Sequence, residues 1–192
     1  MGEAESEPVR AVLCGSALWT VSCIIMSRAA VEQLQYLMDE AFEGDSNHSL
    51  LANLRSVTEE DWSWVPPEGG RAIRHIVAHV AASKHMYDHY AFGEGRWTFS
   101  DPPFSDDALF VQEHSMPELT GWLREGQDVL REHVAELDDA ELLVPRRTNW
   151  GELYETRRII AVMIEHDLYH AGEINHIRAL RQENDRWAWQ TA

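Results

Sequence analysis

The chain of 192 residues is long enough to bury one hydrophobic core and too short for two comfortable domains. Hydrophobic residues make up 44% of it and charged residues 26%, a balance that argues against a disordered protein. The formal net charge of -17 would repel a phosphate backbone, so we expect no nucleic-acid partner. The chain is expected to fold alone or as a small oligomer such as a homodimer.

An apolar run of 16 residues lies near the N-terminus, at 11–26. It is shorter than the ~20 residues that span a membrane. A secretory signal would begin with positive charge, but the residues before this run contain one arginine, Arg10, and three glutamates. The two cysteines of the run lack the CxxC spacing, which favours a reducing compartment. We therefore expect a cytoplasmic protein without a membrane anchor, with residues 1–25 as a leader, disordered or an artefact of the start codon, and residues 26–192 as the domain.

Apolar residues with three-and-four spacing predict helices along most of the remaining chain. The principal ones are expected at residues 29–42, 71–92, 117–137 and 156–181. A shorter helix follows the first, with Asp45, Ser46 or Asn47 as its cap, before prolines and glycines break the pattern at 62–70. Pro117 suits the first turn of the third long helix.

The connection at 93–116 shows no sustained period and contains the aromatic residues Trp97, Phe99, Phe104 and Phe110. Such a long connection is usually functional or disordered, and its aromatic content favours a functional one. No alternation typical of strands appears. The sequence therefore predicts an all-α fold, an up-and-down four-helix bundle with a long loop between the second and third helices.

Ten histidines make metal binding the first chemistry to consider, because neutral imidazole is a common metal ligand. On an ideal helix each residue advances by about 100°, so the direction of a side chain relative to the apolar stripe can be predicted. In the helix at 71–92, His79 lies roughly 90° from the centre of that stripe. The other histidines of this helix, His75, His85 and His89, lie roughly 130° to 170° away. Only His79 can easily face the interior.

In the helix at 156–181, His170 lies roughly 30° and His166 roughly 70° from the centre of the apolar stripe, whereas His176 lies roughly 150° away. Histidines at positions i and i+4 are about 6 Å apart along the axis, so both can reach one ion at about 2.1 Å. With His79 from a facing helix, the sequence predicts one divalent metal on three histidines. Three nitrogen donors leave a position open for water or substrate.

Asp167 lies roughly 30° from the same apolar centre, where an unpaired carboxylate would be unfavourable. It is a candidate to accept a hydrogen bond from a ligating imidazole, or to pair with an arginine such as Arg178. The sequence does not separate these two roles. No serine, cysteine or carboxylate can be assigned as a catalytic base.

The segments RAIRHIVAHV at 71–80 and HDLYHAGEI at 166–174 resemble the DinB superfamily and its YfiT-like metal-dependent enzymes. The resemblance covers about residues 26–187. It implies a four-helix bundle with nickel or zinc on His79, His166 and His170, the residues that the helical phase also selects. Related proteins include thiol S-transferases and an isomerase that use a low-molecular-weight thiol.

The leading hypothesis is therefore a metal-dependent thiol S-transferase or hydrolase that acts on a small molecule. The alternative is a stress-associated bundle that binds a metal or small ligand without turnover. A metalloprotease of the HExxH type is disfavoured, because Asp167 is shorter than the glutamate of that motif. A di-iron site needs two Glu-x-x-His motifs, and the sequence contains one, from Glu173 to His176.

Overall fold

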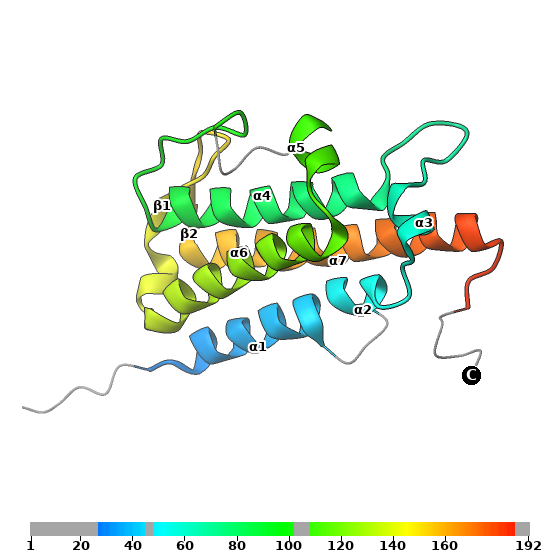
Figure 1. Cartoon of the computed structure of the whole chain (residues 1–192). Helices are drawn as coiled ribbons and strands as arrows, with labels where there is room; N and C mark the ends of the chain where they lie inside the picture. Colours follow the sequence, from blue (N-terminus) through cyan, green and yellow to red (C-terminus); the bar gives the residue numbers. More distant parts are fainter. Residues whose placement is uncertain (1–26, 45–47, 102–107, 187–192) are drawn as a thin grey trace, which may run out of the picture.

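The computed structural model describes residues 27–44, 48–101 and 108–186, and this part of the chain is predominantly helical (Figure 1). Its helices are α1 (Ala29–Glu43), α2 (Leu50–Leu54), α3 (Glu59–Ser63), α4 (Ile73–Ala91), α5 (Ala108–Glu113), α6 (Met116–Glu136) and α7 (Thr156–Gln182). The all-α prediction is confirmed in this coarse sense. The expected leader at 1–25 and Phe104 lie outside the described residues.

The four longest helices begin and end close to the predicted limits, and a clear local signal marks the start of α6. At the start of α6 the Ser115 hydroxyl accepts a hydrogen bond from the backbone of Glu118, whose carboxylate accepts one from the backbone of Ser115. This reciprocal capping box satisfies two otherwise unpaired N–H groups. The short α2 begins later than predicted: its cap is Ser49, and the proposed cap residues 45–47 lie outside the described residues.

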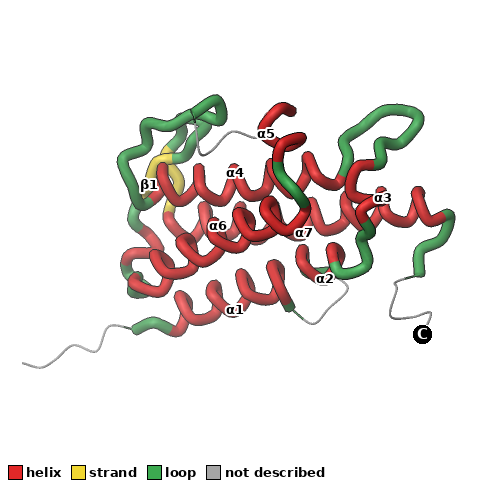
Figure 2. The backbone as a smooth tube through the Cα atoms, in the orientation of Figure 1, coloured by secondary structure: helices red, strands yellow, loops and turns green. Residues whose placement is uncertain are grey.

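A small hairpin was not predicted. After the short 3-10 helix η1 (Glu141–Leu143), strands β1 (Pro145–Arg147) and β2 (Leu153–Glu155) pair antiparallel, as the two yellow segments in Figure 2 show. Each strand has only three residues, which is too short for an alternating pattern to stand out. The hairpin leads directly into α7.

The connection at 93–116 also contains more structure than predicted, because α5 forms within it. Val111 of α5 is fully buried, and its carbonyl accepts a hydrogen bond from the Arg74 guanidinium of α4. Arg74 also donates to the carbonyl of His114 at 3.3 Å. These contacts hold α5 against the N-terminal half of α4.

α4 is enclosed on more sides than its apolar stripe predicted, since it packs against both α6 and α7. Four consecutive residues, Ala81, Ala82, Ser83 and Lys84, are buried. His85 was expected to point away from the interior, yet its ring stacks on Trp122 of α6 with centroids 5.5 Å apart. The phase of one helix cannot reveal a second neighbour on its polar side.

α4 and α6 run in the same direction, as the residue pairs between them show. Lys84 contacts Gln127, and further along α4 Asp88 contacts His133. A simple up-and-down order would make consecutive long helices antiparallel, so our expected topology is wrong at this step. The long connection between them is the physical reason, because only a short loop forces consecutive helices to be antiparallel. None of the described helices combines the length and apolar character needed to cross a membrane.

Candidate metal centre

Three histidines meet where α4 and α7 pack against each other. The helices are antiparallel here: Arg71 near the start of α4 contacts Glu173, and later in α4 His79 lies beside His166 and His170. One ring nitrogen from each imidazole lies within 4.8 Å of the others. The structure therefore brings together all three residues that the sequence predicted for the metal site.

The spacing of the ring nitrogens suits coordination of one ion. The Nε2 atoms of His166 and His170 are 3.2 Å apart. Two ligands bound tetrahedrally at about 2.1 Å would be separated by about 3.4 Å. The ring centroid of His79 is 5.4 Å from that of His166 and 5.3 Å from that of His170, so the third imidazole lies beside the other two.

Burial favours the neutral form of His166 and His170. It lowers the pKa of His166 to about 3, with further lowering from His170, His79, Lys84 and Arg71. Burial also lowers the pKa of His170, although the Glu173 carboxylate partly opposes the shift. A neutral imidazole has the lone pair that metal coordination requires.

Glu173 orients His170. Its Oε2 atom lies 2.8 Å from Nδ1 of His170, and Arg71 donates to the same carboxylate at 3.0 Å. A proton on Nδ1 of His170 leaves Nε2 free to coordinate, an arrangement common around metal-bound histidines. This role was not predicted from the sequence, although the i,i+3 spacing from His170 to Glu173 is a usable signal.

Asp167 has neither of the two roles predicted for it. It is 3% exposed, and its Oδ2 atom accepts from Lys84 Nζ at 2.7 Å, while its Oδ1 atom has no hydrogen-bond partner. Arg178 donates instead to Asn175, one turn before it in α7, and to Gln182, one turn after it. The prediction that Asp167 points inward was correct. Its partner was missed because Lys84 reaches it from α4, a contact that the phase of α7 alone cannot show.

Aromatic rings flank the half-buried side of the three histidines. Phe99 stacks on His79 with ring centroids 6.4 Å apart. Tyr87 meets His166 edge-on at 5.9 Å and meets Trp150, at the turn of the hairpin, at 6.0 Å. Burial raises the pKa of Tyr87 to about 12, so its phenol remains neutral at physiological pH. His170 is buried, whereas His79 and His166 are half-buried and lie next to these rings.

Comparison with known proteins agrees with the fold. A family model described as the DinB superfamily matches residues 45–174, a range that contains His79, His166 and His170. A crystal structure of an uncharacterized protein from Clostridium difficile 630 is similar, with a TM-score of 0.54 and 16% sequence identity. The match covers 79% of this chain and 95% of that chain, and at this identity it supports the fold alone. No curated protein matches.

Proposed function

The chain belongs to the DinB superfamily, and from that premise we propose that it is a metal-dependent enzyme of the thiol S-transferase or hydrolase type. The observation that carries the proposal is the convergence of three histidine nitrogens within 4.8 Å. The proposal includes a cytoplasmic location, a small-molecule substrate and a four-helix bundle composed of α1, α4, α6 and α7, in the helix directions described above.

The residues fit a divalent ion. His79, His166 and His170 would supply three nitrogen ligands, a set that suits zinc or nickel and leaves a coordination position open. A bound ion would supply Lewis acidity and lower the pKa of a coordinated water or low-molecular-weight thiol.

The side chains around the histidines would prepare this site. Glu173 holds the His170 ring so that Nε2 faces the other two histidines. Phe99, Tyr87 and Trp150 would bind the apolar part of a substrate and limit the access of water. These roles agree with thiol transfer to an apolar electrophile and with hydrolysis of an apolar substrate.

Metal analysis of protein without a histidine tag tests the site directly. We expect about one divalent ion per chain in the wild type and a large loss in His166→Ala, because two histidines hold zinc poorly. His176→Ala is the matched control, since His176 is exposed on the same helix. Full occupancy of His166→Ala would refute the site.

A thiol-conjugation screen and a hydrolase screen of the metal-loaded protein test the reaction. Turnover that is lost in His79→Ala, while the variant remains folded, would support catalysis. Stoichiometric metal or ligand binding without turnover across both screens would favour the non-catalytic binding protein instead.

A further inference from the structure

A buried polar cluster lies beside the three histidines. Lys84 of α4 donates to Asp167 of α7 at 2.7 Å and to Gln127 of α6 at 2.8 Å. The side chains of Lys84 and Asp167 are 2% and 4% exposed. Lys84 also lies over the ring of Phe42 from α1, at 4.9 Å from the centroid. One lysine therefore contacts side chains from the other three long helices.

Stability alone explains this cluster poorly. Burial lowers the pKa of Lys84 and raises that of Asp167, and their contact only opposes these shifts. Two further atoms of the cluster, Asp167 Oδ1 and Gln127 Nε2, are buried without a hydrogen-bond partner. Well-packed apolar residues often stabilise a core as well as a buried ion pair does.

The cluster fixes the register of α4 against α7. Asp167 directly follows His166, and Lys84 lies in the same helix as His79, so the ion pair joins the two helices that carry the histidines. Apolar contacts are non-directional and tolerate a shift along the helix axis. A charge-assisted hydrogen bond of 2.7 Å does not tolerate the 1.5 Å shift that corresponds to one residue.

We propose that Lys84 and Asp167 are positioning residues, which set the register of α4 against α7 and thereby hold the three histidines at the separation that a divalent metal needs. Gln127 supports them by orienting the Lys84 ammonium from α6. This inference rests on the proposed metal site and names the residues that preorganise it.

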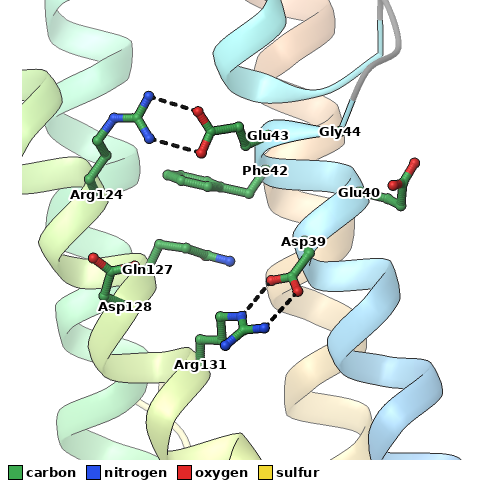
Figure 3. A pocket seen from close by; sticks show the side chains of 9 residues that line it. All are labelled: Asp39, Glu40, Phe42, Glu43, Gly44, Arg124, Gln127, Asp128 and Arg131. Atoms are coloured by element: carbon green, nitrogen blue, oxygen red, sulfur yellow. Dashed lines mark hydrogen bonds and ion pairs between the residues drawn. The ribbon is translucent and has the colours of Figure 1, made fainter.

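An exposed ion pair between two other long helices provides the control. Arg131 of α6 donates to Asp39 of α1 at 2.8 and 3.0 Å, and Arg124 forms a similar pair with Glu43 (Figure 3). Figure 3 also shows Gln127 reaching from α6 toward α1 between Phe42 and the pair of Arg131. The Arg131 pair joins helices that carry none of the three histidines.

The test uses the full chain and two metals. Lys84→Met combined with Asp167→Asn removes both charges and nearly preserves volume, so this double variant avoids an uncompensated buried charge. We expect its Zn²⁺ dissociation constant to rise about tenfold or more, as for other groups that orient metal ligands. The visible spectrum of bound Co²⁺ should also change, because it reports the coordination geometry. Arg131→Met combined with Asp39→Asn should leave both measurements unchanged.

The outcomes separate this inference from the proposed function. Absence of Zn²⁺ binding in the wild type would overturn the metal site itself. Wild-type binding together with unchanged affinity and Co²⁺ spectrum in the double variant would overturn only the positioning role. If circular dichroism shows that the double variant is unfolded, Gln127→Met decides: a rise of about threefold in the Zn²⁺ dissociation constant supports the role, and an unchanged value overturns it.

Discussion

The ion pair between α4 and α7 and the ion pairs between α1 and α6 join neighbouring helices with the same kinds of charge but in opposite surroundings. Lys84 and Asp167 have side chains that are 2% and 4% exposed, whereas those of Arg131 and Asp39 are 48% and 43% exposed. Water screens the second pair and is excluded from the first. A similar contact distance therefore corresponds to different energetic consequences.

The candidate metal centre belongs to the buried side of this comparison. The buried environment in which Lys84 pairs with Asp167 also keeps His166 neutral, because burial lowers the pKa of His166 to about 3. Exclusion of water strengthens each electrostatic interaction among these groups.

Removing only the positive partner of the buried pair should have the largest effect. Lys84→Met leaves the Asp167 carboxylate buried without compensation, so we expect the free energy of unfolding to fall by about 3–5 kcal/mol. Urea unfolding followed by circular dichroism measures it. A loss below about 1 kcal/mol would mean that the pair behaves like an exposed one.

The pH dependence of the metal-free protein should be the next largest effect. The pKa of His166 is about 3 in the folded protein, compared with the ordinary value of 6.5 for a histidine in the unfolded chain. Between pH 3 and pH 6.5 the unfolded chain therefore binds more protons than the folded protein. Stability from this group is complete above pH 6.5 and decreases as the pH falls toward 3, by about 2 kcal/mol at pH 5. Urea unfolding of wild type and His166→Gln at pH 7.5 and pH 5 checks it. If the free energy of unfolding falls by the same amount between pH 7.5 and pH 5 in both proteins, the prediction is wrong.

Removing the carboxylate that orients His170 should weaken metal binding more than folding. Glu173→Ala frees the His170 ring, and we expect the Zn²⁺ dissociation constant to rise by about 10-fold to 100-fold. Competition titration against a chelator measures it. Glu165→Ala is the control, because Glu165 is exposed on the same helix. An unchanged constant for Glu173→Ala would show that packing alone orients the ring.

The smallest effect is expected for the exposed pair. Arg131→Met removes a bidentate contact with Asp39 that is screened by solvent, so the free energy of unfolding should change by about 0–1 kcal/mol. High salt should reduce even this difference, since exposed charges are screened within about 10 Å at 0.1 M salt. Urea unfolding at low and high salt measures both. A loss comparable to that of Lys84→Met would remove the contrast between the two regions.

The periodicity of single helices was enough to predict much of the candidate site. His79, His166 and His170 were identified from their angles to the apolar stripes, and the structure places their nitrogens within 4.8 Å. His176 was predicted to face solvent, and it is exposed. The prediction for His176 was correct because it depends only on which side of one helix is apolar.

Predictions that depended on the partner across a helix interface were less successful. Asp167 was correctly placed inward, but its partner is Lys84 of α4. Lys84 lies four residues after Val80 and three before Tyr87, on the apolar stripe of α4, so its burial could have been predicted, whereas its contact with α7 could not. The phase of α4 also placed His85 toward solvent, where α6 in fact packs. The parallel direction of α4 and α6 was missed for the same reason.

By itself, the sequence determined where the long helices lie and which of their faces are apolar, because these properties follow from the 3.6-residue repeat. It also selected the three histidines whose nitrogens lie within 4.8 Å of one another. Only the tertiary structure decided that Lys84 meets Asp167, that Arg71 contacts Glu173 and that α6 runs parallel to α4. Each of these features joins residues far apart in the chain. Their contacts depend on the direction and register of whole helices, which no local pattern encodes.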